Sequence, residues 1–401
     1  MQLKQRIPAI PETLRRRAAR GVTQAADWAV RTQVRDQWPA WDANKGRFPY
    51  HILIDPAQRA RHPQMWSTCW KTSRAAQGLY CAHLLTGRPE YLESANRAMD
   101  YVATLQIFDP GLEAYRGAFR ENSPLGPHTA TRDGIEAAQG FLAGYLVTKN
   151  ERYLRRAVEG AEFLLRAMKL GWWPISLTWP LEDRRQGKDY FFQNVAALVF
   201  AQLYALTGER RYLTRGVVPL ADNLLKHVRP DGALGVTDAT HSSHHIIATP
   251  GRQLTGVYMN DDGVAVTLLA AYAVTRKAKY RDAALGSADH WARITEPLPL
   301  FAAPAAVSLL LADAYRLTGD ARYLPKLREL TERTLDLQCQ SRDPFIRGCF
   351  IGEDMATIYD KRSKPADYVD LRITSYALIA LSKVAAHKSA QWGCAYSCFG
   401  W

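Results

Sequence analysis

LLTGRPEYL, residues 84–92, is the first of five copies of one short phrase that decide the fold of this 401-residue chain. In every copy a Thr is followed five residues later by a Tyr. An Ala- and Leu-rich segment precedes each copy, and an amphipathic segment with Arg and Glu on one face follows it. Such a repeat predicts a helix, a tight turn and a second helix, repeated along the chain. The other copies are LVTKNERYL (146–154), ALTGERRYL (205–213), AVTRKAKYR (273–281) and RLTGDARYL (316–324).

The residue after the Thr is Gly in three of the copies, at Gly87, Gly208 and Gly319. Helices often end at a residue in the left-handed conformation, which glycine adopts without a steric penalty. We therefore expect the first helix of each hairpin to end at this position. The Tyr begins the next helix, and we expect its ring to pack against the hairpin rather than to take part in chemistry.

Six apolar and six amphipathic segments alternate along the chain. A helix that is apolar all round belongs inside, and a helix with one polar face belongs outside. The alternation therefore predicts an all-α (α/α)6 toroid of six helical hairpins, forming a single domain over residues 1–390. The apolar segments lie near residues 69–85, 132–147, 190–206, 262–274, 301–317 and 371–386. The amphipathic segments lie near 11–32, 89–106, 150–168, 209–227, 278–294 and 321–338.

The connections between these segments differ in length with their direction. Those from an apolar to an amphipathic segment are short turns, whereas those in the other direction are long, near 107–131, 169–189, 228–260 and 339–370. Long loops in a compact domain usually carry function, so we expect the binding face at the end where the apolar helices begin. These helix N-termini would direct their positive dipole ends there. The segment WPAWDANKGRFPYHILID, residues 38–55, is expected to be irregular.

The net charge of +13 favours an acidic partner. Because the Arg residues are spread over outward helix faces and no nucleic-acid motif is present, we expect no nucleic-acid partner. No apolar run reaches the roughly 20 residues that span a bilayer, and the N-terminus lacks the apolar region of a secretory signal. We therefore expect a cytoplasmic protein with no membrane partner.

The six Cys residues form no zinc-type CxxC pair, and most are expected to be buried thiols. We predict neither a metal nor a cofactor. The last eleven residues, QWGCAYSCFGW (391–401), are expected to be a separate tail that packs across the outer ring. A disulfide between Cys394 and Cys398, or a modified peptide, is the alternative.

The hairpin repeat with these turns resembles the six-hairpin glycosidase superfamily, which includes the unsaturated glucuronyl hydrolases. In those enzymes an Asp opens an inner helix a few residues before a Leu-Leu pair, and Asp261 has that context in NDDGVAVTLLAAYAVT. Asp133, in TRDGIEAAQGFLAGYLVT, resembles the other catalytic Asp, although here a whole hairpin separates the two. TIYD (357–360), followed by residues 370–382, resembles the C-terminal domain of D-glucuronyl C5-epimerases. Both families act on uronates, which agrees with the basic charge.

The resemblance implies Asp133 and Asp261 as catalytic carboxylates. Glycoside hydrolysis needs a carboxylic acid to protonate the leaving oxygen and often a second carboxylate to activate water. Asp262 is the like-charged neighbour that would raise the pKa of Asp261. The plainer interpretation of all three is that they cap helices or stabilise their first turns. His244 and Tyr190 are further catalytic candidates, since a His or Tyr beside a uronate can transfer a proton.

Candidate substrate-binding residues lie at the same end of the predicted ring. Aromatic rings stack on the C–H faces of sugars, and a guanidinium binds a carboxylate through two parallel hydrogen bonds. Core packing, loop anchoring and structural salt bridges are the plainer alternatives. The candidates are Trp70, Trp173, Arg132, Arg372, Tyr258, Asn260, Asp262 and Tyr359, with Lys71 and Arg252 as further cations.

Together these features predict a carbohydrate-active enzyme that acts on an acidic, uronate-containing oligosaccharide or polysaccharide. A glycoside hydrolase with paired Asp residues is favoured. The alternative enzymes are a uronate C5-epimerase and a polysaccharide lyase. Outside enzymes, the alternative is a non-catalytic toroid that binds a glycan or a protein.

Overall fold

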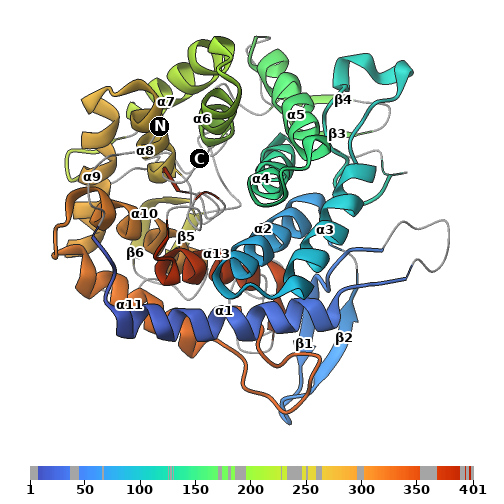
Figure 1. Cartoon of the computed structure of the whole chain (residues 1–401), viewed down its shortest axis with the longest axis vertical. Helices are drawn as coiled ribbons and strands as arrows, with labels where there is room; N and C mark the ends of the chain where they lie inside the picture. The colour runs from blue at the N-terminus through green and yellow to red at the C-terminus, as the bar shows by residue number, and fades with distance from the viewer. Residues whose placement is uncertain are drawn as a thin grey trace.

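The chain forms two concentric rings of helices (Figure 1). The computed structural model describes residues 8–36, 45–65, 67–124, 126, 129, 131–169, 174–178, 182–185, 196–226, 228–232, 246–249, 252–258, 264–295, 302–352, 368–388, 393 and 397–398. Of these, only the backbone is described for residues 64, 132, 169, 174–178, 182–185, 246–249, 252–258, 264, 302–304 and 306.

The inner ring consists of helices that begin near one end of the molecule and contact one another in chain order, with the last contacting the first. This closed order confirms the predicted (α/α)6 toroid. The inner helices are α2 (Cys69–Thr86), α4 (Thr131–Thr148), α6 (Ala196–Thr207), α8 (Val264–Thr275), α10 (Ala302–Thr318) and α13 (Leu371–Ala385). Among the described residues of α6 and α8, almost every side chain in the first two turns is buried, as the apolar pattern requires.

The outer ring surrounds them, and its helices bury only one face. One prediction here is wrong, because residues 209–227 are not one continuous α-helix. A π-helix, η3 (Tyr212–Val217), precedes α7 (Val218–Leu225), and Pro219 follows the junction. Proline has no N–H to donate to the preceding turn, which explains a change of helix type there. The other outer helices are α1 (Glu12–Thr32), α3 (Pro89–Thr104), α5 (Glu151–Lys169), α9 (Ala278–Arg293) and α11 (Tyr323–Asp336). A short 3-10 helix, η1 (Pro110–Tyr115), follows α3.

The five repeated turns share one conformation. The residue after the Thr is left-handed in every copy, with φ of 74° at Gly87, 57° at Lys149 and 62° at Arg276, so the predicted helix end is confirmed even where glycine is absent. The Thr hydroxyl closes the turn from both sides. Thr86 donates to the Ala82 carbonyl at 2.8 Å and accepts from the Arg88 amide at 3.3 Å. The same two bonds form in the other copies.

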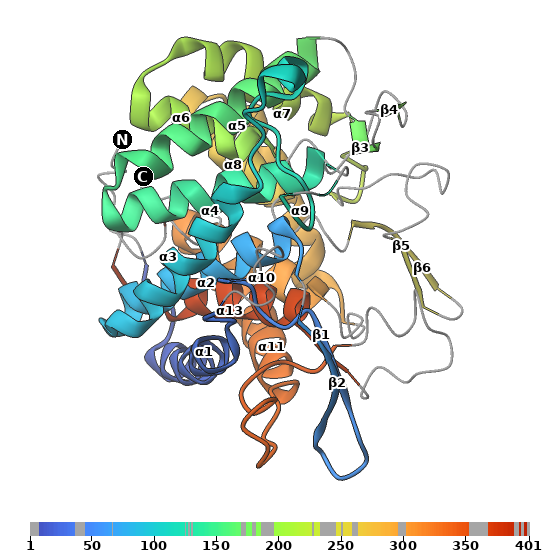
Figure 2. The same ribbon diagram turned by 90° about the vertical axis from the view of Figure 1, so that its right-hand side faces the viewer.

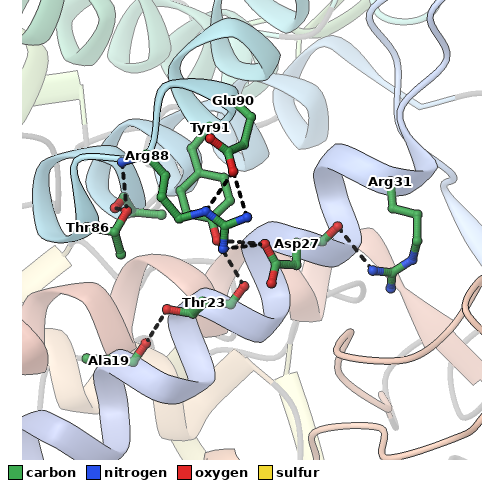
Figure 3. A network of polar contacts seen from close by, with 9 residues as sticks. Ala19, Thr23, Asp27, Arg31, Thr86, Arg88, Glu90 and Tyr91 are labelled. Carbon is green, nitrogen blue, oxygen red and sulfur yellow. Dashed lines mark hydrogen bonds and ion pairs between the residues drawn. The ribbon is translucent and has the colours of Figure 1, made fainter.

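The repeated Tyr packs as expected and also joins neighbouring outer helices. Figure 3 shows Tyr91 and Arg88 approaching Asp27 of α1, with the Tyr91 hydroxyl 2.7 Å and an Arg88 nitrogen 2.9 Å from the carboxylate. Burial, followed by the bond to Asp27, raises the pKa of Tyr91 well above its usual value. The remaining hydroxyl contacts are Tyr153–Asn96 (3.3 Å), Tyr212–Glu162 (3.0 Å), Tyr280–Asp222 (2.8 Å) and Tyr323–Asp289 (2.7 Å).

Every described strand lies in a connection that leads toward an inner helix, and Figure 2 shows β1 to β6 together on one side of the molecule. A three-stranded antiparallel sheet has the order β2-β1-β7, formed by β1 (His51–Ile54), β2 (Ala60–Gln64) and β7 (Tyr368–Asp370). The expectation that residues 38–55 are irregular is therefore wrong for 51–54. Two hairpins complete this side, β3 (Pro174–Thr178) with β4 (Glu182–Arg185) and β5 (Ile246–Thr249) with β6 (Arg252–Tyr258).

The described residues of the tail contact inner helices, so the expected packing across the outer ring is wrong for Gly393, Ser397 and Cys398. Gln202 of α6 donates to the Gly393 carbonyl at 3.2 Å. The Ser397 hydroxyl lies 3.0 Å from both carboxylate oxygens of Asp313 on α10, and the Cys398 amide donates to the same carboxylate at 3.2 Å. Asp313 is completely buried, so its carboxylate has to be satisfied inside the protein.

The five cysteines whose environment is described are all buried and carry free thiols, as predicted for most of the six. None of the helices in the described part of the chain is long and apolar enough to cross a bilayer.

Candidate active site

Helices α2, α4 and α13 are neighbours in the inner ring, and their first turns bring charged side chains together at the strand-bearing end. Asp133 lies in the first turn of α4 and is only 5% exposed. The pKa of the Cys69 thiol at the start of α2 is raised well above its usual value, first by burial and then by the negative charge of Asp133. Asp133 therefore lies close enough to α2 for its charge to act there.

Asp370 is the last residue of β7 and the N-cap of α13, where its carboxylate accepts the Arg372 amide at 2.6 Å. The same oxygen lies 3.3 Å from Lys71 Nζ on α2. The second oxygen lies 3.4 Å from His51 Nδ1, since His51 and Asp370 are directly opposite each other in the pairing of β1 with β7. One carboxylate thus connects the sheet, α2 and α13.

Burial alone would raise the pKa of Asp370, but the charge of Lys71 and the hydrogen bond from His51 outweigh it and hold the pKa at about 2. Asp370 is therefore ionised at neutral pH and can only accept hydrogen bonds. It follows that His51 Nδ1 carries the proton that faces Asp370. In the neutral imidazole this leaves Nε2 as the basic nitrogen.

Two buried cations flank the ring of Trp70 in the first turn of α2. Lys71 Nζ lies 5.3 Å from the centre of the Trp70 ring and 3.5 Å from that of Tyr50. The Arg372 guanidinium lies 5.6 Å from the Trp70 ring. Trp70 is half-buried, whereas Lys71 and Arg372 are 2% and 5% exposed. Positive charge and an accessible aromatic ring therefore lie side by side at this end of the molecule.

One turn further into the ring, Arg74 of α2 forms a completely buried pair with Glu136 of α4. Arg74 Nε donates to one Glu136 oxygen at 3.2 Å, and Nη2 bonds to the other. The guanidinium also lies 3.7 Å from the ring of Tyr376 on α13. These contacts fix the three helices that carry Asp133, Lys71 and Asp370 relative to one another.

Four of the predicted site residues, Asp133, Trp70, Lys71 and Arg372, are described with their side chains, and all four lie in the first turns of inner helices α4, α2 and α13. For Arg132 in α4 and Tyr258 and Arg252 in β6 only the backbone is described. The others lie outside the described residues, so the convergence of Asp133 with Asp261 stays a prediction. They are Asp261, Asp262, Asn260, His244, Tyr190, Trp173 and Tyr359.

Tyr50, His51 and Asp370 belong to this cluster, although they are not among the site residues predicted from the sequence. Asp370 carries the same signal as Asp133, an acidic residue at the start of an apolar helix, and could have been found by it. His51 had no such signal, because it reaches the site through pairing with a strand more than three hundred residues away. Within the described ranges, no group of three or more His, Cys, Asp or Glu side chains could hold a metal ion.

Comparison with solved structures identifies the fold. No protein-family model and no curated protein matches the chain. An unsaturated glucuronyl hydrolase specific for heparin superposes with a TM-score of 0.61 at 16% identity, covering 94% of this chain and 98% of the other. The cellobiose 2-epimerase of Bacillus thermoamylovorans gives 0.61 at 14% identity, with 89% and 97% covered.

A third similar structure is an α-1,6-mannanase from a Salegentibacter species in complex with α-1,6-mannotriose, with a TM-score of 0.56 at 13% identity and 92% and 98% of the two chains covered. That structure is of an inactive variant in which two consecutive aspartates are replaced by asparagine. At such low sequence identities the structural similarity establishes only the fold. This chain has the six-hairpin (α/α)6 toroid fold that hydrolases and epimerases of carbohydrates share.

Proposed function

We propose that the protein is a glycoside hydrolase acting on an acidic, uronate-containing oligosaccharide. The observation that carries the proposal is the buried carboxylate of Asp133 at the first turn of α4. The next helix in the ring, α2, contributes Lys71 from its first turn, and α13 on the far side of α2 contributes Arg372. Carboxylates supply the acid and base of glycoside hydrolysis, and cations bind the carboxylate of a uronate.

In this proposal Asp133 is the base that activates water, because the N-terminal end of α4 favours its ionised form. Asp261 is the acid that protonates the leaving oxygen, and Asp262 raises its pKa as a like-charged neighbour. The two acids precede or begin inner helices that are not adjacent in the ring. We therefore expect a separation above the roughly 5 Å of a retaining pair, which leaves room for water and inverts the anomeric centre.

The known structures of this fold support a carbohydrate substrate. The heparin-specific glucuronyl hydrolase, the cellobiose 2-epimerase and the mannanase all superpose on this chain along almost their entire length. The mannanase is inactive when two consecutive aspartates are replaced. Asp261 and Asp262 are the one Asp-Asp pair in this sequence, and they precede inner helix α8.

The test is to incubate the protein with a panel of uronate-containing oligosaccharides and weigh the products. Hydrolysis adds one water across the cleaved bond, whereas a lyase cleaves without that gain. Asp133→Asn and Asp261→Asn should each lower turnover by about 10²–10⁴-fold while folding stays intact, because each removes an acid–base group. Asp282→Asn, an exposed change on outer helix α9, is the control. Wild-type turnover in both site variants would refute the assignment of the two carboxylates.

The contact between His51 and Asp370 favours uronate C5-epimerisation as a second candidate function. An imidazole whose Nδ1–H faces an ionised carboxylate presents Nε2 as a base, the arrangement that proton abstraction requires. In this case products formed in D₂O would gain one deuterium at C5 without cleavage. His51→Gln should abolish that exchange. His290→Gln is the matched control, because His290 lies 3.8 Å from Asp231 but belongs to outer helix α9.

A further inference from the structure

Cys339 and Cys349 lie opposite each other in the loop that follows α11. The Cys339 amide donates to the Cys349 carbonyl at 2.8 Å, and the Gly348 amide donates to the Cys339 carbonyl at 2.8 Å. Gln338 and Phe350, one position outward on each side, form an antiparallel bridge. Gly348 and Cys349 thus both face Cys339, as in a β-bulge. Opposed positions of antiparallel strands have Cα atoms roughly 4.5–5.5 Å apart, inside the range that a disulfide spans.

The two side chains also face each other. Their thiols are within hydrogen-bonding reach, and the Cys349 thiol donates in addition to the Ile346 carbonyl at 2.6 Å. The hydrogen bond from Cys349 lowers the pKa of Cys339 to about 7, although burial opposes this. At neutral pH a substantial share of Cys339 is thiolate, the reactive form of the side chain. The pKa of Cys349 is raised, first by burial, so Cys349 stays a thiol.

We propose that Cys339 and Cys349 are a modification site at which a peroxide forms an intramolecular disulfide. The Cys339 thiolate attacks hydrogen peroxide, giving Cys339 sulfenic acid and hydroxide. The Cys349 thiol then attacks the sulfenic sulfur, and its proton leaves with the sulfenic hydroxyl as water. The hydroxide from the first step takes up the proton that Cys339 released when it became a thiolate, giving the second water. Overall two thiols and one peroxide give one disulfide and two waters, with two electrons passing from sulfur to peroxide.

The loop closed by this bond connects three parts of the fold. Trp28 and Arg31 of α1 donate to the carbonyls of Phe345 and Pro344 at 2.9 and 2.6 Å. The Asp343 carboxylate accepts the Ala60 amide of β2 at 2.8 Å. After Cys349, the Phe350 amide donates to the Thr374 hydroxyl of α13 at 3.0 Å. The disulfide would therefore fix the loop that joins α1, the β1–β2 hairpin and α13.

The experiment treats the whole protein with hydrogen peroxide, blocks remaining thiols with N-ethylmaleimide in denaturant and maps tryptic peptides by mass. Arg342 and Arg347 lie between the two cysteines, so trypsin separates them unless a disulfide joins the fragments. We expect one linked peptide pair, two hydrogens lighter than the sum of its parts. We also expect a rise in melting temperature of about 2–6 °C, reversed by a reductant.

Cys349→Ser should lose the linked pair and accumulate a dimedone-reactive sulfenic acid at Cys339. Cys398→Ser, at a buried thiol in the tail, should keep the pair. The proposal is overturned if Cys339 and Cys349 of the wild-type protein are both recovered with maleimide attached, or if Cys339 is oxidised to the sulfinic acid without joining Cys349. The peptide map of the wild-type protein decides the matter even if a variant fails to fold.

Discussion

Lys149 and Arg276 occupy the left-handed turn position that glycine occupies in the other three hairpins. A side chain with a Cβ is strained there by roughly 1–2 kcal/mol, part of which glycine returns through its larger entropy in the unfolded chain. Lys149→Gly and Arg276→Gly should therefore each raise the free energy of unfolding by about 0.5–1 kcal/mol. The reciprocal change Gly87→Lys should lower it by a similar amount. Denaturant titration measures the free energy of unfolding of the three variants and of the wild-type protein. If all four are equally stable, the strain argument is contradicted.

The lowered pKa of Asp370 predicts that the folded protein loses stability in acid. Its pKa is lowered to about 2 in the folded protein, below the roughly 3.9 of an unfolded Asp. The resulting stabilisation is present above pH 4 and is lost as the pH falls through 4 toward 2, and it amounts to about 2–3 kcal/mol. Asp370→Asn should lower the free energy of unfolding at pH 6 by about 3–5 kcal/mol, because the buried Lys71 loses its ion pair with Asp370. At pH 2.5 the difference in free energy of unfolding between wild type and Asp370→Asn should be smaller by about 2 kcal/mol. If that difference does not change with pH, the lowered pKa of Asp370 is not its source.

At the scale of helices, the repeated Tyr joins each outer helix to the one before it. Tyr323 donates to the Asp289 carboxylate at 2.7 Å, whereas Tyr153 donates to the neutral Asn96 amide at 3.3 Å. Hydrogen bonds to charged groups contribute more, about 1.5–3 kcal/mol against 0.5–1.5 for neutral ones. Tyr323→Phe should therefore cost more stability than Tyr153→Phe, as chemical denaturation would measure. If the two changes cost the same, the carboxylate is not the source of the difference.

How much of each element could be predicted depends on how local its cause is. The turn from Thr86 to Tyr91 needs only neighbouring residues, so the repeat predicted the hairpins, the left-handed position and the packed Tyr. The alternation of apolar and amphipathic segments predicted the two rings for the same reason. The pairing of strand β1 with β7 could not be found this way, because all five repeated hairpins lie between the two strands. The sequence predicted that Asp133 and Arg372 lie at the start of inner helices, and it missed His51, whose position depends on long-range strand pairing. The catalytic and binding roles of the candidate residues stay predictions.

For the whole molecule, a buried charge cluster links the last inner helices to the tail. Lys383 of α13 lies 2.9 Å from Asp313 of α10, and Arg316 donates to the Lys383 carbonyl at 2.5 Å. Burial lowers the pKa of Arg316 to about 10, so it remains charged at neutral pH. Asp313 thus balances two buried cations and also accepts the tail through Ser397. This carboxylate therefore contributes to the contact between α10 and α13, together with the bonds from Arg316 to the carbonyls of Lys383 and Ala386.

Removing parts of the cluster should therefore have unequal and coupled effects. Ser397→Ala removes hydrogen bonds to a charged group and should cost about 1.5–3 kcal/mol, while Lys383→Met leaves Asp313 partly uncompensated and should cost about 3–5 kcal/mol. Because both side chains act on Asp313, the double variant should differ from the sum of the single ones by at least 0.5 kcal/mol. Thr318→Ala, which removes a partly buried turn hydroxyl, is the additive control in combination with Ser397→Ala. Strict additivity of Ser397→Ala and Lys383→Met would mean that the tail and the ring are held independently.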